Sequence, residues 1–144
     1  MVSAWQNAVE QHINVRASAE QVWALVSNPG WFISGLPEAP TVERVDERLT
    51  LVRDGELGPF LIRTLELVEP SYAAFRWELL GGSSLEPTLI QFWITNDGPG
   101  TVLLKVRESG FAPRPDGDGE EPGTLDENNA GWAEALEAVH RFFE

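Results

Sequence analysis

The sequence predicts an α+β fold in which one long C-terminal helix packs on an antiparallel sheet of about seven strands. Apolar residues in 125–144 recur at intervals of four, three and four, which is typical of an amphipathic helix. Much of segment 41–110 alternates apolar and polar residues, which is typical of half-buried strands. At 144 residues the chain has the size of one domain, so residues 1–144 are expected to share one core.

The C-terminal helix is expected to begin after Thr124. A capping box is predicted there, because Glu127 follows Thr124 at a distance of three residues. The apolar face of this helix comprises Trp132, Leu136, Val139 and Phe143. Such a face needs an apolar surface to pack on, and the strands are the elements that can provide it.

The N-terminal part is expected to form a strand followed by two short helices. Residues 11–16 alternate with period two, and Ser18 and Gln21 then form a second predicted capping box. Asn28-Pro29-Gly30 should stop the first short helix. Residues 31–36 are apolar and broken by Gly and Pro, which indicates a second short helix or an apolar loop.

The remaining strands are predicted from alternating runs separated by turn residues. They comprise residues 41–45, 49–53, 60–68, 72–80, 88–95 and 101–108. The last two should form a hairpin around Asn96-Asp97-Gly98-Pro99-Gly100, and residues 81–84 should form a turn. Residues 112–124, rich in Pro, Gly and acids, are expected to form a surface loop before the final helix.

Composition excludes several classes of partner. Ten basic and 23 acidic residues give a net charge of −13, which repels nucleic acid and anionic membranes at long range. The absence of cysteine excludes thiol catalysis, thiolate metal sites and disulfides, and favours a reducing compartment. No basic N-terminal region or membrane-length apolar run is present, so a cytoplasmic protein is expected.

The sequence indicates no metal site and no cofactor. His12 and His140 are the two histidines, and they lie on a predicted strand and the predicted last helix. Two isolated histidines do not make a metal site. The acidic run from Asp116 has Glu121 where a calcium-binding loop requires glycine, so calcium is not expected.

Four stretches resemble the START-like (SRPBCC) superfamily with its helix-grip fold, and within it the heat-shock protein 90 ATPase activator-like family. They are INVRASAEQVWALVSNPGW (13–31), LELVEPSYAAFRWEL (65–79), TLIQFWITNDGPGTVLLKVRESGF (88–111) and Gly131-Trp132 with Leu136. The resemblance implies a curved sheet that grips the last helix and encloses a hydrophobic small molecule. The separate chaperone-contacting domain of the eukaryotic co-chaperone is absent from this sequence, so the family does not imply chaperone activation here.

In such a fold, aromatic side chains from the short helices, the strands and the last helix should converge on a ligand. The rings considered are Trp31, Phe32, Phe60, Trp77, Phe92, Trp93, Phe111 and Trp132, and several of them are expected to converge. The candidate ligand-binding residues are these rings without Trp93, together with Leu136. For any single ring, ordinary core packing is the better explanation. The hypothesis therefore rests on the group.

Polar candidates on the strands are less certain to face inward. Arg76 and Glu78 are included in the candidate site, because they would face it if Trp77 faced solvent. Glu66 and Glu108 also lie in predicted strands, but charged residues on half-buried strands normally point to water.

Three functions remain open at this stage. The first is non-catalytic binding of a hydrophobic or aromatic small molecule. The second is a chaperone-associated interaction protein, with a chaperone or a second copy of the chain as partner, which would show an exposed apolar patch. The third is an enzyme of the polyketide cyclase or aromatase type, which would need two or more ionisable side chains converging inside the site.

Overall fold

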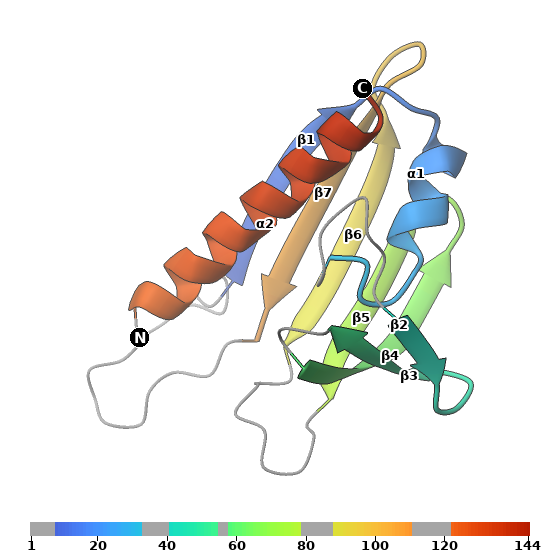
Figure 1. Ribbon diagram of the computed structural model, residues 1–144. Coiled ribbons are helices and arrows are strands. Elements are labelled where there is room, and N and C mark those ends of the chain that lie inside the picture. The colour runs from blue at the N-terminus through green and yellow to red at the C-terminus, as the bar shows by residue number, and fades with distance from the viewer. Residues whose placement is uncertain (1–7, 33–40, 55–57, 79–87, 111–121) are drawn as a thin grey trace.

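The computed structural model describes residues 8–32, 41–54, 58–78, 88–110 and 122–144 (Figure 1). The elements in chain order are β1 (Ala8–Val15), α1 (Ala19–Val26), β2 (Thr41–Arg44), β3 (Leu49–Asp54), β4 (Gly58–Val68), β5 (Tyr72–Glu78), β6 (Leu89–Asn96), β7 (Val102–Ser109) and α2 (Pro122–Phe142). The strands form one antiparallel sheet in the order β1-β7-β6-β5-β4-β3-β2. This confirms the predicted α+β, helix-grip fold.

Helix α2 lies along the face of the sheet formed by β1 and β7, and α1 packs on the same face beside β6 (Figure 1). Trp132, Leu136 and Val139 are buried against the sheet, as the apolar spacing predicts. Two polar contacts tie the helix to β1. Gln11 Nε2 donates to Asn129 Oδ1 at 2.8 Å, and His140 Nδ1 lies 2.8 Å from the backbone oxygen of Asn14.

Helix α2 begins at Pro122, inside the predicted loop 112–124 and before the predicted start. Proline suits the first position of a helix, because its missing N–H would have no intrahelical partner there and its fixed φ is helical. Residues 112–121 of the predicted loop and the side chains of the predicted capping box at Thr124 lie outside the described residues.

The capping box at the start of α1 is confirmed. Ser18 Oγ accepts from the backbone N–H of Gln21, and the Gln21 side chain accepts from the backbone N–H of Ser18. Helix α1 ends at Val26, and Gly30 adopts a φ of 79°, a left-handed conformation that favours glycine. The chain therefore turns back at Gly30 and delivers the next two side chains to the sheet. Residues 33–36, where a second short helix was predicted, lie outside the described residues.

The predicted strands are confirmed to within a few residues at each end. The β6–β7 hairpin pairs Asn96 with Val102 and Leu89 with Ser109, as the turn residues between them predict. The pairing of β4 with β5 shifts between Thr64 and Glu66, which forms a β-bulge. The predicted turn at residues 81–84 falls outside the described part of the chain.

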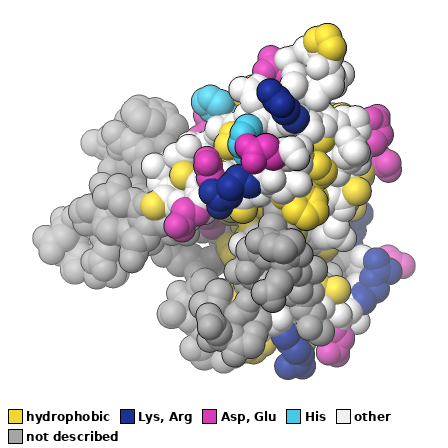
Figure 2. Space-filling model, turned by 45° about the horizontal axis from the view of Figure 1, so that its top comes forward, with side chains coloured by type: hydrophobic (Ala, Val, Ile, Leu, Met, Phe, Trp, Pro, Cys, Tyr) yellow, Lys and Arg dark blue, Asp and Glu magenta, His cyan; other side chains and the backbone are white. Residues whose placement is uncertain are grey.

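The described surface mixes side chains of different kinds. Figure 2 shows one face, on which acidic, basic and hydrophobic side chains are interspersed. Large hydrophobic side chains are exposed on β2, directly after β2 and at the end of β4, namely Val42, Val45, Leu65, Leu67 and Val68. Within the described residues, no helix combines the length and the apolar character needed to cross a membrane.

Candidate functional site

Seven aromatic rings from five parts of the chain meet between the sheet and α2. They come from the turn after α1, from β4, β5 and β6, and from α2. We call them the aromatic cluster: Trp31, Phe32, Phe60, Phe75, Trp77, Phe92 and Trp132. Six of these rings were predicted to converge, and Phe75 joins them.

Phe32 is the centre of the aromatic cluster. Its ring centroid lies 4.9 Å from that of Trp132, 5.7 Å from Trp31, 5.8 Å from Trp77 and 6.0 Å from Phe92. Phe60 extends the cluster, with its centroid 5.5 Å from that of Trp77. Most of these ring pairs are tilted or edge-to-face, the arrangements that aromatic quadrupoles favour.

The period of the strands explains how the rings reach the same face. Phe75 and Trp77 are two residues apart on β5, and every second residue of a strand faces the same side of the sheet. On β6 the same rule turns Phe92 toward α2 and Trp93 to the opposite face. There the Trp93 ring packs 5.6 Å from Tyr72 and lies under the ammonium of Lys105 at 5.0 Å.

The rings of the cluster differ in their exposure to solvent. Trp31, Phe92 and Trp132 are buried, whereas Phe32, Phe60 and Trp77 are half-buried. The half-buried rings therefore form the part of the cluster that an incoming molecule would meet first. Leu136 is buried one helical turn after Trp132 and contributes an aliphatic wall on α2.

A buried carboxylate contacts two rings of the cluster. Glu108 on β7 is 4% exposed, and its two oxygens accept hydrogen bonds from three side chains. Trp132 Nε1 donates to Oε1 at 2.9 Å, and Trp77 Nε1 donates to Oε2 at 3.3 Å. The hydroxyl of Thr88, also buried, donates to Oε2. These bonds fix both indoles to the same carboxylate.

The inward orientation of Glu108 was missed, because a charged residue on a half-buried strand was expected to face water. The period of the strand carried the necessary signal. Val102, Leu104 and Val106 are buried on β7, and Glu108 is the next residue in the same phase. A charged residue in phase with three buried aliphatic residues is therefore predicted to point inward.

The indole N–H of Trp31 has no hydrogen-bond partner among the described residues, although the side chain is 4% exposed. A buried N–H without a partner costs free energy, on the order of 1–3 kcal/mol. Such groups are rare in finished cores, so each one needs an explanation. An acceptor atom on a bound molecule would satisfy this N–H.

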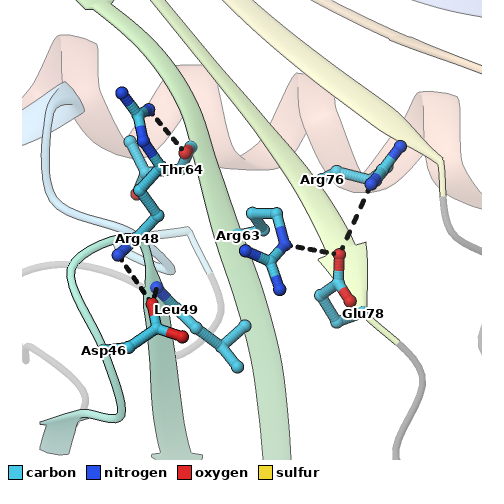
Figure 3. A network of polar contacts seen from close by, with 7 residues as sticks. All are labelled: Asp46, Arg48, Leu49, Arg63, Thr64, Arg76 and Glu78. Atoms are coloured by element: carbon cyan, nitrogen blue, oxygen red, sulfur yellow. Dashed lines mark hydrogen bonds and ion pairs between the residues drawn. The ribbon is translucent and has the colours of Figure 1, made fainter.

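Arg76 and Glu78 do not belong to the site, which corrects the expectation for this pair. Trp77 faces the cluster, so its two neighbours on β5 face the other side of the sheet. There Glu78 Oε2 lies 3.0 Å from Arg63 Nε and 3.6 Å from Arg76 Nη2 (Figure 3). All three side chains are partly exposed, and such pairs usually contribute little to stability.

Two other predicted features can be placed only in part. Phe111 lies outside the described residues. Within the described residues, no group of three or more His, Cys, Asp or Glu side chains is arranged to hold a metal ion.

Solved structures define the class of fold to which this arrangement belongs. The chain shares its fold with several solved structures. An uncharacterised protein from Bacillus thuringiensis matches with a TM-score of 0.72 and 13% identity, over 94% of this chain and 98% of that one. No protein-family model matches the sequence, and no curated protein matches it significantly.

Two further solved structures belong to proteins that have names. The Aha1 dimer from Colwellia psychrerythraea matches with a TM-score of 0.68 and 11% identity, over 95% of this chain and 96% of that one. DynU16, a protein of the dynemicin biosynthetic locus, matches with a TM-score of 0.66 and 20% identity, over 94% of this chain and 46% of that one. At these identities the likeness establishes the fold and leaves function to the site.

Proposed function

We propose that the chain is a START-like (SRPBCC) binding protein of the heat-shock protein 90 ATPase activator-like family that holds a hydrophobic or aromatic small molecule without catalysis. The proposed site lies between the sheet and α2, on the half-buried rings of the aromatic cluster. The proposed contacts are Phe32, Phe60, Trp77 and Trp132, with Trp31, Phe92 and Leu136 behind them.

The observation that carries this proposal is the combination of a half-buried ring surface with two kinds of polar group. Ligand sites are mostly apolar and contain a few polar groups at fixed positions. Here Glu108 is an acceptor held in place by two indoles, and Trp31 is a buried donor with no partner among the described residues. A core that only fills space has no need of either group.

Two tryptophans provide a matched test. Trp77 and Trp93 are both half-buried strand residues, but Trp77 belongs to the cluster and Trp93 packs on the opposite face. We expect Trp77→Ala to weaken binding of a fluorescent apolar probe about tenfold or more, and Trp93→Ala to leave the affinity within about twofold; tenfold corresponds to about 1.4 kcal/mol.

The probe affinities should be measured by titration well below the melting temperature of each variant. If Trp77→Ala does not fold, Phe60→Leu removes another half-buried ring of the cluster and should also weaken binding. Equal affinities for wild type and both cluster variants would exclude this surface as the site. Native mass spectrometry of the purified protein would reveal a small molecule that remains bound.

A second candidate function is interaction with a protein partner, either a chaperone or a second copy of the chain. It is favoured by the exposed hydrophobic side chains of β4, namely Leu65, Leu67 and Val68. Leu67→Lys should then abolish self-association in light scattering or retention on immobilised heat-shock protein 90. Phe142→Lys, on the exposed side of α2, is the matched control. Wild type that is monomeric and not retained would remove this candidate.

Catalysis of the polyketide cyclase type has less support. That hypothesis needs two or more ionisable side chains in the site, and Glu108 is the one that contacts the cluster within the described residues. The cytoplasmic location expected from the sequence stays a prediction, which fractionation of the source cells would test.

A further inference from the structure

Among the described residues, no lysine, arginine or histidine forms an ion pair with the carboxylate of Glu108. Its three hydrogen-bond donors, two indoles and a hydroxyl, are neutral. The ion pairs among the described residues are elsewhere, for example between Arg63 and Glu78 on the opposite face. An ionised carboxylate that is taken out of water without a cation is costly, even when hydrogen bonds satisfy its oxygens. A cationic group that binds near Glu108 would therefore be stabilised by its carboxylate.

On each side of the sheet a tryptophan lies near a carboxylate, but the two sides differ in whether a described cation accompanies them. On the outer side, Lys105 places its ammonium 5.0 Å from the centre of the Trp93 ring and 3.8 Å from Glu10 Oε2. A cation thus lies over an indole and next to a carboxylate. On the inner side, the indole of Trp77 and the carboxylate of Glu108 are also together, but no described lysine or arginine lies over this ring.

The hydrogen bond between the two inner groups strengthens the effect. An indole whose N–H donates to a carboxylate is polarised, so its π face becomes more negative. Cations bind to the π face of tryptophan more strongly than to other rings, and the attraction grows when water is excluded. The half-buried Trp77 ring next to a buried Glu108 meets both conditions.

We propose that the ligand of this site is an organic cation, in which an amine or quaternary ammonium group is attached to a flat apolar body. The positive centre lies against Trp77 and Glu108, and the apolar body lies on Phe32 and Phe60. This inference rests on the proposed function, because it specifies the class of molecule that the same site takes.

A pair of probes of the same shape tests the charge preference. Naphthylmethylamine is a cation at neutral pH, and naphthylmethanol is its neutral counterpart. Calorimetric titration of wild type should show that the amine binds about tenfold more tightly than the alcohol or better. The preference should persist at about 1 M salt, where the Debye length is about 3 Å and the long-range field of the acidic surface is screened.

Two charge-neutralising variants separate the site from the surface. Glu108→Gln removes the buried charge, so the amine should lose its advantage and bind within about twofold of the alcohol. Glu137→Gln removes one charge from the exposed side of α2 and should retain the full preference. Circular dichroism would check that both variants fold. If Glu108→Gln does not fold, the wild-type comparison at high salt decides the question.

Each outcome has a defined meaning. Equal binding of amine and alcohol by wild type would overturn the inference and leave the proposed function in place. A preference that survives in Glu108→Gln, or that disappears at high salt, would also overturn it. If neither probe nor any apolar dye binds wild type, the proposed function fails, and the further inference fails with it.

Discussion

Replacing Trp132 by phenylalanine isolates the hydrogen bond between α2 and Glu108. The substitution keeps an aromatic ring next to Phe32 and Phe92 but removes the indole N–H, which donates to Glu108 Oε1 at 2.9 Å. Trp23 provides the control. It is a buried tryptophan on α1 whose indole makes no hydrogen bond to another described side chain, so Trp23→Phe loses ring volume alone.

The expected cost follows from two contributions. A hydrogen bond to a charged group contributes about 1.5–3 kcal/mol. The smaller ring adds about 1 kcal/mol, similar to the removal of one buried methyl group. Trp132→Phe should therefore lower the free energy of unfolding by about 2.5–4 kcal/mol, and Trp23→Phe by about 1 kcal/mol. For a chain of this length, each kcal/mol lowers the melting temperature by about 2–4 °C.

Urea denaturation of the four proteins of a double-mutant cycle would measure the bond itself. When Glu108 is already glutamine, Trp132→Phe should cost less, because a bond to a neutral amide contributes only about 0.5–1.5 kcal/mol. The coupling energy between Trp132 and Glu108 should then be about 1 kcal/mol or more. Additivity within about 0.5 kcal/mol, or equal costs for Trp132→Phe and Trp23→Phe, would refute the reasoning.

Three further predictions concern the core, a helix cap and a turn. Phe92→Ala should lower the free energy of unfolding by about 3–5 kcal/mol because the ring is fully buried, whereas Phe142→Ala, 51% exposed, should change it by less than about 0.5 kcal/mol in the same urea assay. Ser18→Ala should cost about 1 kcal/mol by removing the cap of α1, and a drop in melting temperature with retained far-UV dichroism would show this. The carboxylate of Asp46 accepts hydrogen bonds from the backbone N–H groups of Arg48 and Leu49, and these bonds, that of Arg48 first, lower the pKa of Asp46 below its usual 3.8. The contribution of ionised Asp46 to the free energy of unfolding is therefore present above pH 3.8 and is lost as the pH falls through the lowered pKa. The difference in stability between wild type and Asp46→Ala should vanish in strong acid, and a difference that stays constant with pH would contradict this.

The regular elements could be predicted because each carries a local signal. The apolar spacing of Trp132, Leu136 and Val139 on α2 needs no knowledge of the partner surface, and these three residues are buried. The cap formed by Ser18 and Gln21 is likewise complete within four residues of sequence. The start of α2 at Pro122 was placed too late, because composition alone was used to assign that segment to a loop.

The site was harder to predict because it depends on which strands become neighbours. That Phe32, Trp77 and Trp132 would meet requires the strand order, which no local pattern contains. The phase of a strand, by contrast, is local. On β5 it separates Trp77 from Arg76 and Glu78, and on β7 it aligns Glu108 with the buried valines and leucine. A rule that assigns charged residues to the surface overrides this phase and led to the omission of Glu108. Arg76 and Glu78 were included for the opposite reason, since the prediction allowed Trp77 to face solvent.

The position of Glu108 supports the proposal that the aromatic cluster is a binding site. An aliphatic residue at the same place would fill the space without the cost of burying a charge, and buried ionic groups can often be replaced by apolar ones with no loss of stability. Here the neighbouring donors all depend on the carboxylate, since Trp77, Thr88 and Trp132 would lose their acceptor together. The carboxylate thereby fixes the orientation of two indoles that come from different elements, one from β5 and one from α2. A fixed pair of indoles around a negative charge is a preorganised surface, and preorganisation reduces the free energy that a protein must spend to order its side chains when a ligand binds.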